Sequence, residues 1–78
     1  MLPIEARVRE LVAGVCGIDP DELEGDRSLV DYGLDSARAM DLVVDVEAAF
    51  SLQIPDDVAT KLKSTDDIVA YVTARVTT

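Results

Sequence analysis

A serine at the junction between a glycine-containing loop and a helical pattern is the residue of this chain best suited to chemistry. Ser36 follows Asp35 directly, and the helical pattern begins at this point. A serine at a helix start often serves as the N-cap, because its side-chain oxygen can accept a hydrogen bond from a first-turn N–H group. Asp35 is an equally good cap and could leave the Ser36 hydroxyl free. Two roles therefore stay open for Ser36, a helix cap or a point of covalent attachment.

The residues that most serine-based active sites need are missing around Ser36. The chain has no histidine, so no imidazole can activate the hydroxyl, and no glycine pair for an oxyanion site lies nearby. A lone carboxylate such as Asp35 activates an adjacent serine poorly. Phosphate-loop and dinucleotide-binding motifs are absent as well. We therefore expect a protein that is not an enzyme.

The residue types present also disfavour a metal site and an intramolecular disulfide. Cys16 is the single cysteine, and without histidine the usual zinc spacings are absent. Asp19, Asp21 and Asp26 resemble part of a calcium loop, but the central glycine and closing glutamate do not fall at the required offsets. We expect no metal site, and we expect Cys16 to act as a small, buried or half-buried hydrophobic residue.

An exposed serine at a helix N-terminus is a suitable place for a phosphodiester. The helix dipole and the unpaired first-turn N–H groups favour an anion there, and a flexible loop before the helix would let a modifying enzyme reach the hydroxyl. The carboxylates of Asp31 and Asp35 oppose such an anion. Their position suggests that they serve recognition by a basic partner instead.

Length and composition predict one small, acidic, helical domain covering residues 1–78. The 78 residues carry a formal net charge of −9, and 49% of them are hydrophobic but only 4% aromatic. This charge argues against nucleic acid and anionic membranes as partners and favours basic proteins, although acidity that only maintains solubility is an equal alternative. No signal segment or membrane-spanning run is present, so we expect a cytoplasmic protein. We also expect a monomer. Because the chain opens with Met1 and shows no linker, we expect it to be stand-alone.

Hydrophobic periodicity predicts an all-α bundle of four helices. Three main helices are expected at about 3–16, 36–50 and 65–76, and a short one at about 56–62. Gly17 is a natural stop for the first helix. Residues 64–67 form a capping box for the last one.

A long loop joins the first two predicted helices. Asp19 and Pro20 are expected to start a capped single turn within it. A loop of this length is usually either functional or held on the core. We expect this loop to be held on the core by five apolar residues: Ile18, Leu23, Leu29, Tyr32 and Leu34.

The helix at 36–50 has two apolar faces. The expected core face consists of Ala39, Leu42, Val43, Val46 and Phe50. A second strip consists of Ala37, Met40, Val44 and Ala48, edged by Asp41 and Glu47. Either this strip is packed against another helix, which composition alone favours, or it contacts a partner, for which methionine is well suited.

Gly33–Leu34–Asp35–Ser36, the helix that follows and the later Ile54–Pro55–Asp56 resemble the acyl carrier protein family over nearly the whole chain. The resemblance implies a four-helix fold with Ser36 as the attachment site for 4′-phosphopantetheine, installed from coenzyme A by a phosphopantetheinyl transferase. The thiol of that arm would carry acyl groups as thioesters between ketosynthases and other acyl-transferring or acyl-modifying enzymes with basic docking patches. The resemblance also implies a recognition face on the second helix: Asp35, Ala37, Arg38, Met40, Asp41, Val44 and Glu47.

Three positions bear on the kind of carrier. Ala37 follows the serine where the family very often has leucine, and Arg38 places a positive charge at a helix start that is usually neutral or acidic. Leu34 resembles acyl carriers more than peptidyl carriers. We therefore expect polyketide or specialised acyl biosynthesis, with a primary fatty-acid carrier as the first alternative and an unmodified acidic helical adaptor as the second.

Overall fold

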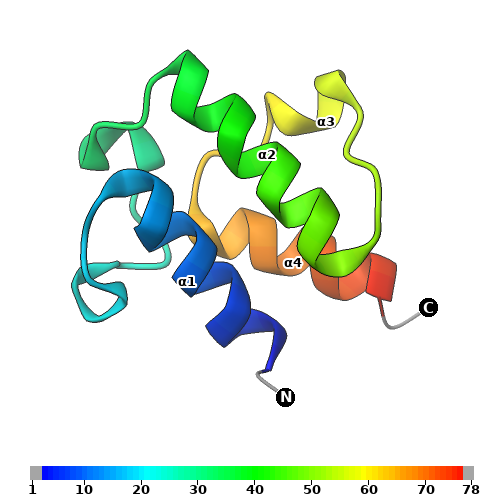
Figure 1. Cartoon of the computed structure of the whole chain (residues 1–78), viewed down its shortest axis with the longest axis horizontal. Helices are drawn as coiled ribbons and strands as arrows, with labels where there is room; N and C mark the ends of the chain where they lie inside the picture. Colours follow the sequence, from blue (N-terminus) through cyan, green and yellow to red (C-terminus); the bar gives the residue numbers. More distant parts are fainter. Residues whose placement is uncertain (1–2, 77–78) are drawn as a thin grey trace.

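The computed structural model describes residues 3–76, which form helices and connecting turns around one hydrophobic core. The α-helices are α1 (Ile4–Cys16), α2 (Ser36–Phe50), α3 (Asp56–Ala59) and α4 (Thr65–Val76). Two 3₁₀ helices, η1 (Pro20–Glu22) and η2 (Leu29–Tyr32), lie in the loop between α1 and α2. Helix α1 packs against both α2 and α4, while the short α3 lies beside α2 (Figure 1). The predicted four-helix, all-α fold is confirmed.

The core is built almost entirely from aliphatic side chains of the three long helices and the loop. Val8, Val12 and Val72 are fully buried, and Val46 is almost so. Cys16 is buried with them at 7% exposure, as predicted. Burial raises the pKa of the Cys16 thiol above its ordinary value, and the Arg38 guanidinium partly opposes this effect.

Local signals in the sequence explain most helix boundaries. Gly17 closes α1 in the left-handed conformation with φ 73°, and its N–H donates to Ala13 O. The predicted capping box at α4 is present, because Asp67 N donates to Ser64 Oγ and Ser64 N donates to Asp67 Oδ2, both at 3.2 Å. The first helix begins one residue later than predicted, since Pro3 is its N-cap.

The third helix is shorter than predicted. We expected it at 56–62, but α3 ends at Ala59. The next residues tighten into turns in which Lys61 N donates to Val58 O at 2.9 Å and Leu62 N donates to Ala59 O at 3.2 Å. These i→i+3 bonds break the α-helical ladder and bring Leu62 against the core. Periodicity alone could not separate one α-helical turn from this mixed arrangement.

The long loop, residues 17–35, is fixed by its apolar residues and by polar contacts. Leu23 and Leu29 are buried, and Ile18, Tyr32 and Leu34 pack partly against the core, as predicted. Asp19 Oδ1 accepts a hydrogen bond from Asp21 N at 3.0 Å, which confirms the predicted capped turn. The 3₁₀ helix η2 was not predicted.

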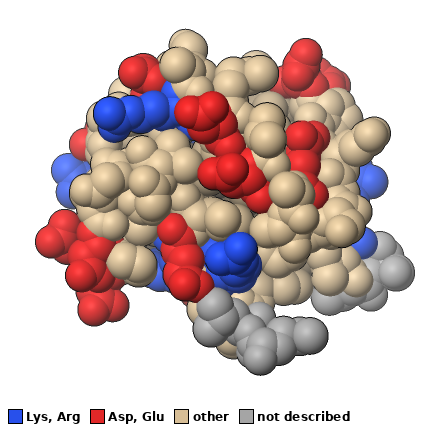
Figure 2. Space-filling model, viewed as in Figure 1, with Lys and Arg blue, Asp and Glu red and all other residues tan. Residues whose placement is uncertain are grey.

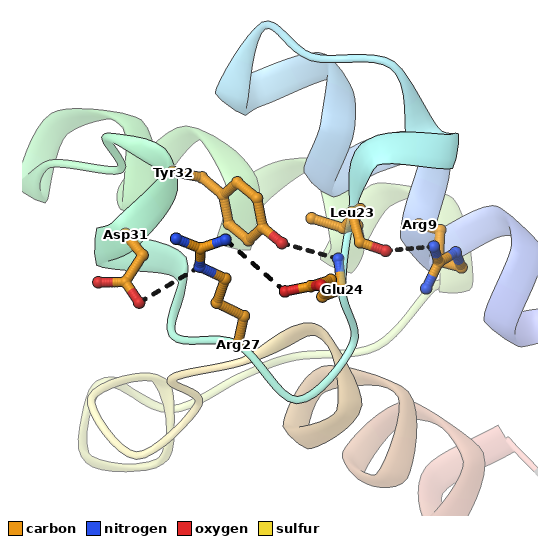
Figure 3. Close-up of polar contacts among 6 residues, drawn as sticks. All are labelled: Arg9, Leu23, Glu24, Arg27, Asp31 and Tyr32. Carbon is orange, nitrogen blue, oxygen red and sulfur yellow. Dashed lines mark hydrogen bonds and ion pairs between the residues drawn. The ribbon is translucent and has the colours of Figure 1, made fainter.

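The polar contacts of this loop centre on two arginines (Figure 3). Arg9 of α1 donates hydrogen bonds to the carbonyl oxygens of Pro20 and Leu23. The Arg27 guanidinium lies 5.3 Å from the centre of the Tyr32 ring, and the Tyr32 hydroxyl accepts a hydrogen bond from Glu24 N at 2.7 Å. The segment that leads to Ser36 is thus held to α1 and to itself by polar contacts, in addition to the predicted apolar ones.

The later part of the loop is also tied to the residues before α4. Leu29 N donates to Lys63 O at 2.8 Å, and Asp66 N donates to Gly25 O at 2.9 Å. Ser28 and Ser64 form an isolated antiparallel bridge. Through these bonds the loop, and with it the start of α2, is positioned by both the first and the last helix.

Candidate functional site

Asp35 is the N-cap of α2, and this decides the first question about Ser36. The Asp35 Oδ1 atom accepts a hydrogen bond from Arg38 N at 2.8 Å. Gly33, with φ 85°, ends η2 and turns the chain toward α2. Ser36 is the first residue of the helix and is exposed. Its hydroxyl is therefore not needed as a cap and is accessible to an enzyme.

The surroundings of Ser36 fit a covalently attached anion such as a phosphodiester. Asp35 satisfies only the N–H of Arg38, so the earlier N–H groups of the first turn still point out of the helix end. Helix α2 is 15 residues long, so its dipole favours negative charge at this end. No acidic residue lies in its first turn after the cap. An attached phosphate would meet partial positive charge on the helix and negative charge on Asp35.

The second apolar strip of α2 lies at the surface. Ala37 and Ala48 are exposed, and Met40 and Val44 keep 60% and 57% of their surface accessible. The opposite face is buried as predicted, with Leu42 and Val46 in the core. Composition had favoured packing on both sides of α2, but within residues 3–76 no element covers this strip. It is an apolar surface available to a partner.

The charged residues around the strip differ in their surroundings. Asp41 and Arg38 are exposed, and no ion pair of either is found among the described residues. Glu47 is only half-exposed, and its Oε2 atom accepts a hydrogen bond from Ile54 N at 2.7 Å. The carboxylate of Glu47 therefore holds the chain after α2, a structural role that the sequence did not reveal.

A small, partly open apolar cavity lies behind the core face of α2. It has a volume of about 40 Å³ and is lined by apolar side chains of α2, of the region around α3 and of α4, including Val43, Leu62 and Ile68. This volume leaves room for no more than a few water molecules or a fragment of an acyl chain. Its presence was not predicted, because it depends on how α3 and the residues after it sit over α2.

Within residues 3–76, no group of three or more histidine, cysteine or acidic side chains could hold a metal ion. In the same range, no helix is long and apolar enough to cross a membrane.

The chain is similar to known proteins in both sequence and structure. Residues 6–72 match the family described as "Phosphopantetheine attachment site". An acyl carrier protein of Bdellovibrio bacteriovorus is 35% identical over 71 residues, which cover 90% of this chain and 91% of that protein. The solution structure of a putative acyl carrier protein from Anaplasma phagocytophilum superposes with a TM-score of 0.83 at 37% identity, covering 92% of this chain and 86% of that one.

A third relative is a much longer protein. Clavatol synthase claF of Penicillium crustosum is 33% identical over 69 residues, which cover 88% of this chain but 3% of the synthase. The similarity thus extends both to proteins of this size and to a short region of a large synthase.

Proposed function

This chain belongs to the acyl carrier protein family and carries a covalently attached phosphopantetheine, and on that premise we propose that Ser36 is the attachment site. The chain would hold acyl intermediates as thioesters and deliver them to partner enzymes of polyketide or specialised acyl biosynthesis. The thiol of the phosphopantetheine arm would form the thioester with the acyl group. Proteins of this family are generally non-catalytic carriers.

The observation that supports the proposal is that Asp35 and Ser36 have different roles at the start of α2. Asp35 caps α2 through the 2.8 Å bond from Arg38 N, so the exposed Ser36 hydroxyl at the helix end is free for modification. The loop before it is held by hydrogen bonds to α1 and to the residues before α4. A phosphopantetheinyl transferase would then bind a preformed surface and would not have to order a disordered segment.

The recognition face proposed for partner enzymes surrounds Ser36 and continues along α2. Met40 and Val44 supply exposed apolar area, and Asp41, which has no ion pair within residues 3–76, supplies a negative charge for a basic docking patch. Glu47 would contribute mainly by fixing the chain beyond α2. The full set is Asp35, Ala37, Arg38, Met40, Asp41, Val44 and Glu47.

The proposed pathway rests on the relatives of this chain and on two residues at the start of α2. The match to a region of clavatol synthase claF, together with Ala37 and Arg38 at the start of α2, favours polyketide or specialised acyl biosynthesis. The alternative, a primary fatty-acid carrier, is favoured by the near full-length match to the Bdellovibrio acyl carrier protein. We also propose that residues 1–78 form one carrier domain that acts as a cytoplasmic monomer.

The attachment is tested with coenzyme A, magnesium and a phosphopantetheinyl transferase of broad specificity, followed by intact mass measurement. The wild-type chain is expected to gain one phosphopantetheine unit, and Ser36→Ala is expected to gain none. Ser28→Ala is the matched control, because Ser28 is an exposed serine whose side chain caps no helix. No gain on the wild type would favour the unmodified adaptor, and a gain that survives Ser36→Ala would place the arm on another residue.

A further inference from the structure

A single peptide group joins the first helix to the turn that precedes Ser36 (Figure 3). It is the peptide between Leu23 and Glu24, just after η1. Its carbonyl oxygen, on Leu23, accepts a hydrogen bond from the Arg9 guanidinium of α1. Its N–H group, on Glu24, donates to the Tyr32 hydroxyl at 2.7 Å. The peptide is thus held at both ends, by α1 on one side and by η2 on the other.

These two hydrogen bonds strengthen each other. The donor at the carbonyl end is a charged guanidinium, and it polarises the peptide so that the N–H group becomes a better donor. Arg9 also donates to the carbonyl oxygen of Pro20 at 3.1 Å, so the same side chain fixes the start of η1. The contacts that run from Arg9 through this peptide to Tyr32 are called the Arg9–Tyr32 link below.

The ring of Tyr32 is held independently of its hydroxyl. Tyr32 packs partly against the core, and the Arg27 guanidinium lies 5.3 Å from the centre of its ring. Arg27 also pairs with Glu24 at 3.6 Å and with Asp31 at 3.5 Å, but these side chains are at least half exposed, so the ion pairs contribute little. The ring would therefore stay in place without the hydroxyl, and it is the hydroxyl that fixes η2 against Glu24.

The position of η2 determines where α2 starts. Tyr32 is the last residue of η2, and only three residues separate it from Ser36. The first of these, Gly33, ends η2, and the second, Leu34, donates its N–H to Leu29 O at 3.3 Å. A displacement of η2 is therefore passed on to the start of α2.

We propose that the Arg9–Tyr32 link sets the position in which the Ser36 hydroxyl meets the phosphopantetheinyl transferase, which makes Tyr32 a positioning residue for the modification. This inference rests on the proposed function. The link acts on alignment and not on docking, because the docking face proposed on α2, over which acidic side chains gather (Figure 2), includes neither Tyr32 nor Arg9. A misplacement of about 1 Å between reacting groups can lower a rate by about 100-fold.

The test follows single-turnover modification of the full chain, with a broad-specificity transferase in excess and coenzyme A saturating. Tyr32→Phe keeps the ring and removes only the hydroxyl. Its rate constant at saturating transferase should fall by about fivefold or more, while the half-saturating transferase concentration stays within about twofold of the wild-type value. A merely structural role would do the reverse, because a smaller folded fraction raises the half-saturating concentration.

Tyr71→Phe is the matched control. Tyr71 is also half-buried, the Arg75 guanidinium lies 5.0 Å from its ring centre, and its hydroxyl donates to Gln53 O at 3.4 Å, between α4 and the segment after α2. Both of its constants should stay within about twofold of the wild-type values. The proposal would be overturned by a Tyr32→Phe rate constant within about twofold of the wild type, or by an equal fall in Tyr71→Phe.

Breaking the link at its other end tests the coupling. Arg9→Met keeps an apolar stem but cannot donate to Leu23 O, so it should lower the same rate constant. The double variant Arg9→Met, Tyr32→Phe should lose no more than about twofold beyond the larger single effect, because both substitutions act through one peptide group. Losses that multiply would show that the two side chains act separately and would overturn the link.

Hydrogen exchange of the unmodified chain gives a readout that needs no transferase. Exchange of the Leu34 amide should be faster in Tyr32→Phe than in the wild type and unchanged in Tyr71→Phe. An unchanged Leu34 amide in Tyr32→Phe would count against the proposal. Failure of the proposed function is seen separately, as a wild-type chain that gains no mass or gains it at a residue other than Ser36.

Discussion

The Glu47 carboxylate accepts a hydrogen bond from the backbone N–H of Ile54 at 2.7 Å, across the turn that leaves α2. The same residue's carbonyl oxygen accepts the N–H groups of Ser51 and Leu52, which close the helix. Glu47 therefore organises the whole connection from α2 toward α3. Ile54 is buried, so this connection also determines how the core is closed at that end.

Replacing Glu47 by lysine is expected to destabilise the fold. The substitution leaves the partly buried Ile54 N–H without its charged acceptor, which costs about 1–3 kcal/mol of the free energy of unfolding. Asp41→Lys is the matched control on the same helix. Asp41 is exposed and unpaired among the described residues, so its reversal should change the free energy by less than about 0.5 kcal/mol. Urea denaturation of both variants measures the difference, and equal losses would show that Glu47 Oε2 does not hold Ile54.

The difference between these two carboxylates marks the limit of what the sequence predicts. Periodicity placed the two carboxylates on either side of the apolar strip of α2, and it identified the core face and the Asp35–Ser36 junction. It could not predict that Glu47 turns to an amide seven residues later, because that contact depends on the path of the chain after α2. The hydrogen bonds from Arg9 to the carbonyl oxygens of Pro20 and Leu23 could not be predicted for the same reason. Every residue has a backbone carbonyl, so the sequence does not indicate which one a side chain will contact.

For the second apolar strip of α2, the sequence left open whether it is buried or exposed. Its residues, Met40 and Val44 among them, are compatible with burial or with a partner surface. Only the packing of the other helices, with α1 and α4 against each other and α1 against α2, decides between the two. Side-chain periodicity specifies which residues share a face, but not whether another element covers that face.

Ser51 is a position where a single substitution should stabilise the protein. It closes α2 with φ 53°, a left-handed conformation that disfavours residues with a Cβ atom. Ser51→Gly removes this cost but gains chain entropy in the unfolded state, so a net increase of roughly 0.5–1 kcal/mol in the free energy of unfolding is expected.

Ser51→Ala separates this backbone effect from any effect of the hydroxyl. Alanine keeps the Cβ atom, so its free energy of unfolding should lie within about 0.5 kcal/mol of the wild type. Urea denaturation compares the three chains. If both variants were equally stabilised, the serine hydroxyl and not the backbone conformation would be responsible.

The buried thiol of Cys16 predicts a pH dependence of stability. Burial raises the pKa of the Cys16 thiol in the folded state, so the folded chain retains this proton at a pH where the unfolded chain releases it. The contribution of Cys16 is therefore full below the unfolded thiol pKa of about 8.5 and is lost as the pH rises through the folded value. Unfolding of the wild type and Cys16→Ala at pH 7 and above pH 9 checks this sign. The stability difference between them should shift against the wild type at high pH, and a constant difference would contradict it.

Ala37 and Arg38 are expected to exclude enzymes built for a general fatty-acid carrier. Arg38 is an exposed cation, without an ion pair among the described residues, in the first turn after Ser36, so it repels a basic docking patch. Ala37 offers less apolar contact than a leucine would offer at this position. The double variant Ala37→Leu, Arg38→Gln should therefore raise the kcat/KM of a fatty-acid malonyl transferase for the holo chain by about tenfold, which corresponds to 1.4 kcal/mol.

The single variants separate the two causes. The gain from Arg38→Gln should fall with added salt, because an exposed charge is screened, while the gain from Ala37→Leu should persist. Arg38→Lys keeps the charge and should leave the kcat/KM near the wild-type value. If the malonyl transferase used the wild-type chain as efficiently as its own carrier, these two residues would not select partners. The specialised role would then lose its main support in the residues around Ser36.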